Sequence, residues 1–409
     1  MERTILHCDM NNFYASVECV LDPSIKDKPV AVCGNEKERH GIVLAKNYFA
    51  KNFGVKTGDP IWQAKNKCKN LIIIDAPHFD KYMEYSNKAK ELYLKYTDLV
   101  EPMGLDECWL DVTHSIKLFG SGKAIADELR ENIKRKFGLT ISVGVSFNKT
   151  FAKLGSDMKK PDATTVITKD NFKELVWPLP VESLIGVGYR TKKLLNKFFI
   201  KTIGDLANET KERLEYLMGK NGITLYNAAN GIEDDDVQNF YELDKAKSIS
   251  HGITTVRDLN NNYEVWNVML ELTQEIALKL RQSKLRAGGV YISIRDSKLY
   301  WQQYRRKLKT SEISAYNIAK FAFELFKEKY SWEDPVRNIT VGVMQLVNDT
   351  EPIQMNIFDN FYKTEKIEKI EKVMQNLNMK YKNEVVTTAT LMKNNNLPKN
   401  RRKVNYDKK

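Results

Sequence analysis

Two adjacent carboxylates, Asp106 and Glu107, interrupt the apolar stretch PMGLDECWLD at residues 102–111. Carboxylates are rarely buried unless they are paired or bind a metal ion. Neighbouring residues of a strand point to opposite faces, so these two side chains can meet only at a strand end, a bulge or a tight turn. Gly104 just before them permits such a turn. We therefore expect a core strand whose charged end lies at the edge of a sheet.

A third acid, Asp9, closes the apolar stretch RTILHCD at residues 3–9. If the two stretches are neighbouring strands, Asp9 and the pair at 106 and 107 converge at one edge. Three carboxylates in one place repel each other unless cations neutralise them. Hard oxygen ligands without a His or Cys cluster favour Mg²⁺ or Mn²⁺, and two such ions about 4 Å apart promote in-line displacement at phosphorus. On spacing alone, a hairpin whose acids face solvent explains the pattern equally well.

Length and cysteine usage indicate an intracellular protein of several domains. A chain of 409 residues, 42% of them hydrophobic, is expected to form two to four domains. Its five cysteines form no CxxC pair, which favours a reducing compartment. The start of the chain lacks the pattern of a signal peptide, and no apolar run is long enough to span a membrane. We expect a cytoplasmic protein that does not contact membranes.

The positive charge is confined to the later part of the chain. Residues 1–244 contain 35 basic and 35 acidic residues, whereas residues 245–348 contain 17 and 10 and residues 360–409 contain 13 and 5. A polyanion is the natural partner of such a surface. A basic surface that only keeps the protein soluble is the alternative that charge alone leaves open.

Hydrophobic periodicity predicts two different α+β units. In the first half, strands at 3–9 and 138–147 and helices at 78–97 and 122–137 predict helices packed on one face of a small, mostly antiparallel sheet. In the second half the order is βαββαβ, which suits a four-stranded sheet backed by two helices. Its predicted elements are strand 248–257, helix 262–284, strands 287–297 and 299–309, helix 312–329 and strand 336–347. Beyond residue 348 we expect a largely disordered tail with one helical stretch at 365–377.

Four sequence motifs follow one another in a characteristic order: DMNNFYASVE, NYFAKNFGVK, GLDECWLD and SVGVSFNKTFAKLGSDMKKP. With these motifs the chain resembles the Y-family DNA polymerases, in particular their bacterial translesion branch, from about residue 3 to residue 348. The resemblance implies an α+β multidomain, right-hand-like polymerase with a ferredoxin-like palm and a small fingers domain. The implied domains are a palm at 1–10 and 76–167, fingers at 11–75, a helical thumb with a helix-hairpin-helix at 168–239, a linker at 240–247, a βαββαβ little-finger domain at 248–348 and a flexible tail at 349–409.

The resemblance implies a template-directed, error-prone DNA polymerase for translesion synthesis that lacks proofreading. By similarity, Asp9, Asp106 and Glu107 are the catalytic acids that hold two Mg²⁺ ions, for which Mn²⁺ can substitute. The backbone carbonyl of Met10 adds a ligand. Another two-metal enzyme on the same type of sheet, such as a nucleotide cyclase, explains the acids but not the later domains. A non-catalytic DNA-binding protein is the third hypothesis.

The resemblance also implies a nucleotide-binding site. Tyr14 matches the steric gate beneath the incoming sugar, where a ring collides with a 2′-hydroxyl, and Phe13 lies beside it. Without the resemblance, packing at the start of a helix explains Phe13 and Tyr14 equally well. Residues that match triphosphate contacts are Tyr48, Lys51 and Lys160. Lys51 stands where the family commonly has arginine, and Ala45 where it has a hydroxyl residue, so we expect weaker nucleotide binding because lysine lacks the bidentate grip of arginine.

The remaining implied partners are primer-template DNA and a bacterial sliding clamp. Gly186 and Gly188 let the backbone approach a phosphate. The basic, aromatic stretch RDSKLYWQQYRRKLK supplies further DNA contacts at Arg295, Lys298, Arg305 and Arg306. In PIQMNIFD, the residues that resemble a clamp-binding peptide are Gln354, Met355, Ile357 and Phe358. We expect a monomer that is associated with the nucleoid when it is engaged on DNA.

Overall fold

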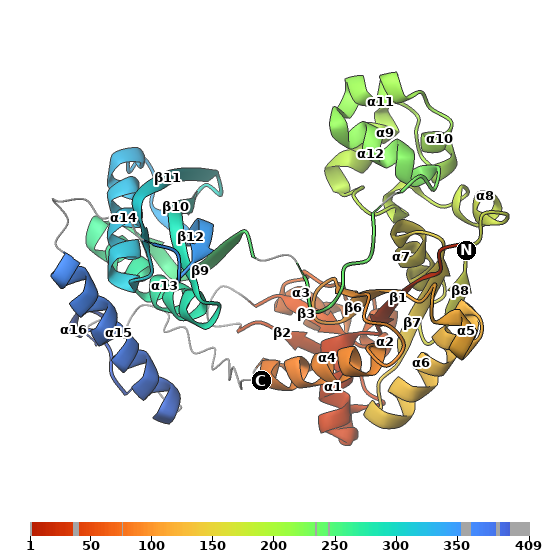
Figure 1. Ribbon diagram of the computed structural model, residues 1–409, viewed down its shortest axis with the longest axis horizontal. Coiled ribbons are helices and arrows are strands. Elements are labelled where there is room, and N and C mark those ends of the chain that lie inside the picture. Colours follow the sequence, from red (N-terminus) through yellow and green to blue (C-terminus); the bar gives the residue numbers. More distant parts are fainter. Residues whose placement is uncertain are drawn as a thin grey trace. The chain divides into compact units, whose positions relative to one another are not determined.

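The computed structural model describes residues 2–35, 41–75, 77–233, 235–243, 246–352, 361–381 and 385–392. The described chain forms two compact units, and the first of them ends at Leu243 (Figure 1). The second unit holds the described residues from 246 onward. No helix within these ranges combines the length and hydropathy that a membrane crossing requires.

A five-stranded sheet in the order β5-β6-β1-β7-β8 forms the centre of the first unit. Its strands are β1 (Ile5–Met10), β5 (Val100–Pro102), β6 (Glu107–Asp111), β7 (Ile141–Ser146) and β8 (Thr164–Val166). β1 pairs antiparallel with both β6 and β7, and β8 runs parallel to β7. The predicted strands at 3–9 and 138–147 are therefore confirmed, and the first strand neighbours the one that carries Glu107, which meets the condition for Asp9 to lie near the pair at 106 and 107.

Helices cover both faces of this sheet, so the prediction of helices on one face is wrong. Leu6 and Cys8 pack into a core with three helices, whereas Ile5 packs with Trp109 and Ala152 on the opposite face. A Cβ atom at Gly144 would lie 1.8 Å from the Ala152 carbonyl oxygen, so the helix on that face rests directly on β7. The helices are α1 (Phe13–Leu21), α4 (Phe79–Tyr93) and α6 (Gly122–Phe137) on one face, α7 (Lys149–Met158) on the other, and the short α5 (Ile116–Phe119).

Two smaller subdomains complete the first unit. One is a three-stranded sheet in the order β3-β2-β4, in which β2 runs parallel to β4. Its elements are β2 (Val30–Cys33), β3 (Val43–Lys46), β4 (Ile72–Ile74), α2 (Tyr48–Asn52), α3 (Ile61–Lys67) and the 3₁₀ turn η1 (Pro23–Ile25). The other is helical and has its own core. It contains α8 (Phe172–Val176), η3 (Val181–Ser183), α9 (Tyr189–Lys197), α10 (Ile203–Ala207), α11 (Lys211–Met218) and α12 (Lys220–Ala229).

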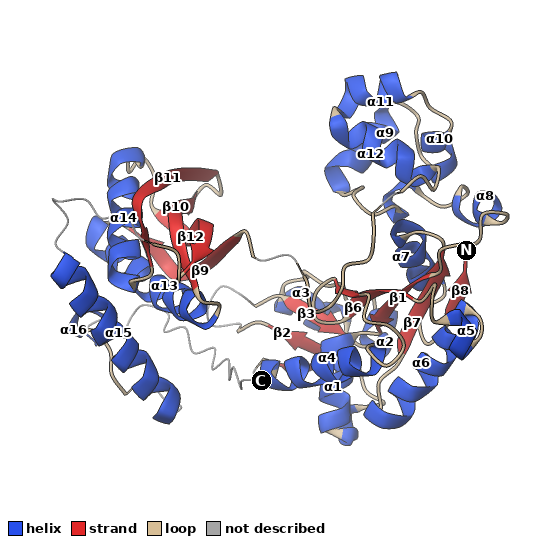
Figure 2. Cartoon of the chain, in the orientation of Figure 1, coloured by secondary structure: helices blue, strands red, loops and turns tan. Residues whose placement is uncertain are grey.

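The second unit has the predicted βαββαβ order and forms an antiparallel sheet in the order β11-β10-β12-β9. Its elements are β9 (Ser248–Leu259), α13 (Asn262–Gln282), β10 (Leu285–Asp296), β11 (Trp301–Glu312), α14 (Ala315–Lys329) and β12 (Val336–Asn348). Figure 2 shows the two helices side by side on one face of the sheet, over a core that includes Val290, Ile292 and Ile294. The other face of the sheet carries no helix of this pair.

In the tail, where one helical stretch was expected, residues 361–381 form a 21-residue helix, α15 (Phe361–Tyr381), followed by α16 (Ala389–Met392). Glu371 of α15 is buried and caps the start of α14: it accepts hydrogen bonds from the Ser314 hydroxyl at 2.9 Å and the Ala315 amide at 3.0 Å. Arg281 of α13 donates to the same carboxylate at 2.7 Å. The predicted helical stretch at 365–377 is confirmed, and α15 is a packed part of the second unit.

This anchor predicts the effect of removing Glu371. Glu371→Ala leaves the Arg281 guanidinium and the first turn of α14 without their carboxylate, which we expect to destabilise the contact by about 2–4 kcal/mol. Hydrogen–deuterium exchange should accelerate in α15 and at the start of α14. Glu365→Ala on the same helix is the control, because Glu365 lies at the surface and pairs with Lys369 one turn away. Equal exchange in both variants would contradict this role of Glu371.

Candidate active site

The charged edge of the central sheet is built by the pairing of β1 with β6. Asp9 lies directly opposite Glu107, and the Met10 amide donates to the Asp106 carbonyl at 3.0 Å. This hydrogen-bond pattern makes Asp9 and Glu107 a non-hydrogen-bonded pair, whose Cα atoms lie about 4.5 Å apart and whose side chains approach closely. Like charges in such a pair destabilise a sheet. The two carboxylates therefore require a cation beside them.

Asp106 reaches this edge because the chain turns just before β6. Gly104 has a φ of +105°, and the Met103 amide donates to the Glu107 carbonyl at 2.8 Å across the turn. The adjacent carboxylates thus lie at the start of a strand, as the sequence predicts. The amide and carbonyl of a strand residue point to the same neighbouring strand, so the Met10 carbonyl also lies on the Asp106 side.

Two lysines from α7 and the loop after it neutralise the facing carboxylates. The Lys160 ammonium lies 2.6 Å from Asp9 Oδ2 and 2.8 Å from Asp157 Oδ1. Lys153 pairs with Glu107 Oε2. Lys160 was predicted to contact a triphosphate, and the structure places it beside Asp9. Sequence reasoning missed Lys153, although α7 presents it to the same edge.

The environment separates the pKa values of the three acids. Burial raises the pKa of Asp9 to about 6, although the Lys160 charge opposes this shift. Burial also raises the pKa of Asp106. For Glu107, burial acts in the same direction but is outweighed by the hydrogen bonds and charges of His7 and Lys153, which lower its pKa to about 2. Burial disfavours the charged form of Lys160, but Asp9 and Asp157 prevail and raise its pKa to about 12. Asp9 and Asp106 are thus poised for additional positive charge.

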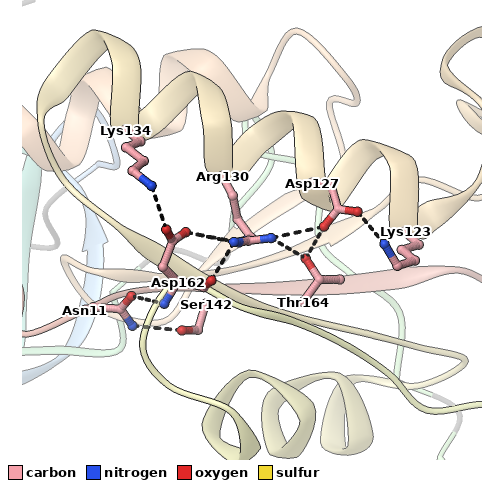
Figure 3. Close-up of polar contacts among 8 residues, drawn as sticks. All are labelled: Asn11, Lys123, Asp127, Arg130, Lys134, Ser142, Asp162 and Thr164. Carbon is pink, nitrogen blue, oxygen red and sulfur yellow. Dashed lines mark hydrogen bonds and ion pairs between the residues drawn. The ribbon is translucent and has the colours of Figure 1, made fainter.

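A polar network holds the loop that carries Lys160 against the end of β1 (Figure 3). Asn11 accepts a hydrogen bond from the Asp162 amide at 2.9 Å and donates to the Ser142 hydroxyl at 2.9 Å. Arg130 of α6 donates to the Asp162 carbonyl at 2.5 Å and pairs with its carboxylate at 3.0 Å. The loop, and Lys160 with it, is therefore tied to both α6 and the central sheet. Sequence reasoning did not identify this network, because its members are far apart in the chain.

Tyr14 lies in an aromatic cluster with Phe13 at the start of α1. Its ring stacks on Tyr82 of α4, with centroids 4.4 Å apart and planes at 15°. The Tyr82 hydroxyl donates to the buried carboxylate of Glu18 at 2.5 Å, and the His78 ring lies 3.0 Å from the same carboxylate. Tyr14 is consequently held by a stack that is itself hydrogen-bonded.

The predicted nucleotide contacts on the fingers-like subdomain lie on one short helix. Tyr48 and Lys51 both belong to α2, and the Lys51 ammonium lies 5.5 Å from the Tyr48 ring centroid. Burial raises the pKa of the Tyr48 hydroxyl, on which the charges of Lys160 and Asp9 also act. The structure therefore brings Tyr48 close to the carboxylate edge.

A cleft of about 370 Å³ lies between α7 and the helical subdomain. Lys153 and Asp157 of α7 line one side, and the predicted hairpin with Gly186 and Gly188 lines the other. Gly186 has a φ of +91°, a conformation that favours glycine, and a Cβ atom at Gly188 would meet no heavy atom within 4 Å. The backbone just before α9 is therefore accessible to a ligand. It lines the same cleft as Lys153, which pairs with Glu107.

In the second unit, the predicted basic residues divide between the two faces of the sheet. Arg305 is exposed and lies opposite Tyr291 on the face without α13 and α14, whereas Arg306 pairs with Glu328 of α14. In the same unit, Lys298 forms an ion pair with Asp334 at 2.9 Å, and the Arg295 guanidinium lies 5.5 Å from the Trp301 ring centroid. The predicted clamp-binding residues 354, 355, 357 and 358 lie outside the described residues.

Comparison with known proteins identifies the family. The model of the impB/mucB/samB family matches residues 8–157, and the model of its C-terminal domain matches residues 246–357. A DNA polymerase IV of Acetivibrio thermocellus is 47% identical over 382 residues, which cover 93% of this chain and 95% of that protein. DNA polymerase IV 1 of Bacillus subtilis is 36% identical and covers 96% of this chain and 94% of its own length. The chain belongs to the Y family of DNA polymerases.

The fold supports this assignment independently. A solved Y-family DNA polymerase chimera matches with a TM-score of 0.76 and 25% identity over 84% of this chain and 99% of that chain. The α+β multidomain fold expected from the sequence is thereby confirmed. As a Y-family member, the protein is a DNA-directed DNA polymerase, a nucleotidyltransferase that acts on primer-template DNA and nucleotides and depends on divalent metal ions.

The residues at the edge fit a divalent cation in their chemistry. All three side chains offer carboxylate oxygens, and two of them have raised pKa values because burial disfavours their charged forms. As the side chains stand, no group of three His, Cys, Asp or Glu residues in the described ranges is arranged to hold an ion. The lysines account for this, because Lys160 engages Asp9 and Lys153 engages Glu107. An entering cation would replace the Lys160 contact at Asp9.

Proposed function

We propose that this Y-family polymerase performs translesion synthesis, adding deoxynucleotides to a primer 3′ end by Mg²⁺-dependent, two-metal phosphoryl transfer without proofreading. The observation that carries the proposal is the facing pair of Asp9 and Glu107, joined by Asp106 at the turn before β6. A nucleotide cyclase would require the same carboxylates but not the 246–357 domain match. A DNA-binding protein without catalysis would not require facing carboxylates at all.

The proposed metal ligands are the three acids and one backbone group. Asp9, Asp106 and Glu107 would hold two Mg²⁺ ions, with the Met10 carbonyl as a further ligand. When bound, the ions supply positive charge to the attacking and leaving oxygens of the transfer. The side chains have little covalent chemistry left to perform, so their contribution is to position the reactants and to balance charge.

Lys160, Tyr48 and Lys51 are the proposed triphosphate contacts. Lys160 remains cationic because its pKa is raised, and it lies at the edge where the phosphates would bind. Its loop is tied to Arg130 and Asn11, which hold the backbone of this loop at the edge while the ammonium exchanges Asp9 for phosphate oxygens. Lys51 offers a point charge rather than a bidentate fork, which should weaken nucleotide binding relative to an arginine.

DNA is proposed to bind through phosphates at two places. The hairpin at Gly186 and Gly188 would bind the DNA sugar-phosphate backbone near the catalytic edge. The free amides at the start of a helix favour binding of a phosphate there. In the second unit, the sheet face that carries Arg305 would supply positive charge. Arg306 lies on the helix side of the sheet and pairs with Glu328, so we propose a smaller contribution to DNA binding from this residue than from Arg305.

We further propose that the chain works as a monomer that docks on a sliding clamp. The support is the QMNIF sequence at residues 354–358, in which the apolar pair Ile357 and Phe358 follows Gln354 at peptide-motif spacing. Both anchors suit a hydrophobic groove on a partner.

The catalytic assignment predicts the behaviour of Asp106→Asn. We expect template-dependent primer extension with Mg²⁺ in the wild type and a loss of at least about a thousandfold in the variant, because one metal ligand is removed. Binding of the same primer-template should be retained within about threefold. Asp170→Asn, at an exposed position, is the charge-matched control. Normal extension by Asp106→Asn would refute the assignment.

The sugar gate predicts a graded series of variants. Tyr14→Ala should raise ribonucleotide incorporation by about 10- to 100-fold, because the ring that excludes the 2′-hydroxyl is lost. Tyr82→Leu should give a smaller rise, since Tyr14 loses its stacking partner but remains present. Tyr82→Phe keeps the stacked ring but loses the hydrogen bond to Glu18, so it separates the contribution of the stack from that of the hydrogen bond. The measurement is the ratio of kcat/KM for a deoxynucleotide and the matching ribonucleotide; an unchanged ratio in Tyr14→Ala would assign Tyr14 to packing alone.

The two faces of the second sheet predict different effects of adjacent arginines. Arg305→Ala should weaken primer-template binding and reduce the slope of log K against log salt by about 1, because one phosphate contact is lost. Arg306→Ala should leave the slope unchanged, since Arg306 pairs with Glu328 on the helix side. Fluorescence anisotropy across a salt series tests both, and equal slopes for the two variants would argue against the proposed face.

The proposed clamp-binding peptide predicts that stimulation by the clamp can be removed without loss of basal synthesis. Gln354→Ala combined with Phe358→Ala should abolish stimulation of primer extension by a bacterial sliding clamp while synthesis without the clamp is unaffected. The double variant keeps the chain length and therefore the position of α15. Stimulation that persists in this variant would place the clamp contact elsewhere.

A further inference from the structure

Ser86 is a fully buried residue in the middle of α4 to which the mechanism above gives no role. A serine hydroxyl inside a helix commonly donates to the carbonyl four residues earlier, which here belongs to Tyr82. Ser86 instead donates to the Leu105 carbonyl at 2.5 Å, nineteen residues further along the chain. Burying a hydroxyl without a hydrogen bond is costly, so this bond stabilises the site. It joins α4 to the turn that carries Asp106.

The turn that carries Asp106 has little to hold it from within. A hydrogen bond from the Met103 amide to the Glu107 carbonyl closes the turn at 2.8 Å. Gly104 is exposed, has a φ of +105° and has no side chain that could pack against a neighbour. The direction of the Asp106 side chain therefore depends on the contacts that this turn makes with the rest of the first unit.

Two neighbouring elements hold consecutive carbonyls of the turn. The Leu105 carbonyl accepts from Ser86 of α4, and the Asp106 carbonyl accepts from the Met10 amide of β1 at 3.0 Å. Because peptide units are planar, these two bonds fix the peptide planes before and after the Cα atom of Asp106. The Leu105 side chain also packs against the core to which α4 contributes. Together these contacts define the direction in which the Asp106 side chain leaves the backbone.

We propose that Ser86 is a positioning residue for Asp106: its hydrogen bond fixes the peptide plane before Asp106 and so directs this carboxylate to the edge shared with Asp9 and Glu107. The inference rests on the proposed function, because the direction of Asp106 matters to the reaction only if this carboxylate holds a cation. Groups that orient metal-binding side chains commonly change metal affinity or activity by about 10- to 100-fold when they are removed. The hydrogen bond itself is a property of the metal-free protein and can be tested there.

Tyr93 provides a matched control on the same helix. Its hydroxyl is buried and makes no hydrogen bond within the described part of the chain. Tyr93→Phe and Ser86→Ala each remove one buried hydroxyl from α4, but only Ser86→Ala removes a donor from the turn. Tyr82, one turn before Ser86, reports on the position of the helix, because its ring stacks on Tyr14.

The first measurement is hydrogen–deuterium exchange of the metal-free protein. The probes are the amides of Met10 and Met103, whose hydrogen bonds end at Asp106 and Glu107. Ser86→Ala should accelerate exchange at both amides by about fivefold, the change that loss of one hydrogen bond produces in a local opening equilibrium. Tyr93→Phe should exchange like the wild type. Equal exchange at these amides in the wild type and Ser86→Ala would overturn the restraint.

The second measurement is Mn²⁺ affinity, followed by electron paramagnetic resonance in the complex with a dideoxy-terminated primer-template and a matched deoxynucleotide. Ser86→Ala should raise the half-saturating Mn²⁺ concentration by about tenfold, whereas Tyr93→Phe should not change it. The ratio of kcat/KM for a deoxynucleotide and the matching ribonucleotide should stay within about twofold of the wild type in Ser86→Ala, because Tyr82 remains stacked on Tyr14.

The outcomes separate this proposal from the proposed function. Unchanged Mn²⁺ affinity in Ser86→Ala would overturn the positioning role. So would a weaker affinity accompanied by lost sugar discrimination, because the whole of α4 would then have moved. A wild-type protein that extends no primer, yet shows faster exchange in Ser86→Ala than in Tyr93→Phe, would overturn the function and leave the restraint of the turn intact. If Ser86→Ala does not fold, Ser86→Cys, whose thiol is a weaker donor, takes its place with the same expected changes.

Discussion

Electrostatic repulsion between Asp9 and Glu107 is the constraint on which the rest of the active-site structure depends. Their register makes them a facing pair on adjacent strands, where like charges destabilise the sheet. Two ammonium groups offset this repulsion: Lys160 pairs with Asp9, and Lys153 pairs with Glu107. Such an arrangement keeps the edge intact without a bound cation.

The two lysines are positioned by different parts of the first unit. Lys153 belongs to α7, which can approach the sheet closely because Gly144 has no side chain. Lys160 belongs to the loop that Arg130 and Asn11 tie to α6 and β1. Because α7 is packed on the sheet and the loop is hydrogen-bonded, the charges around the carboxylates are organised before any substrate arrives, and preorganised charge is a large contribution to phosphoryl-transfer catalysis.

Local sequence patterns predicted what depends on local spacing. The strand at β1, the βαββαβ order of the second unit and the strand end at Asp106 could all be predicted from the spacing of residues in the sequence. Long-range pairings could not: α15 is anchored by Glu371 against Arg281, ninety residues earlier in the chain. Strand alternation also separates Arg305 from Arg306 onto opposite faces, a difference that the sequence analysis did not use when it named both as DNA contacts.

The central claim is that Asp9, Asp106 and Glu107 together hold divalent cations for nucleotide transfer. The most direct test counts Mn²⁺ ions by electron paramagnetic resonance in the protein bound to a dideoxy-terminated primer-template and a matched deoxynucleotide, with the nucleotide alone as the reference. The account predicts two ions per chain in the wild type and a clear deficit in Asp9→Asn at the same Mn²⁺ concentration. Identical Mn²⁺ binding by the wild type and Asp9→Asn would contradict it, because the cations would then be held by other groups.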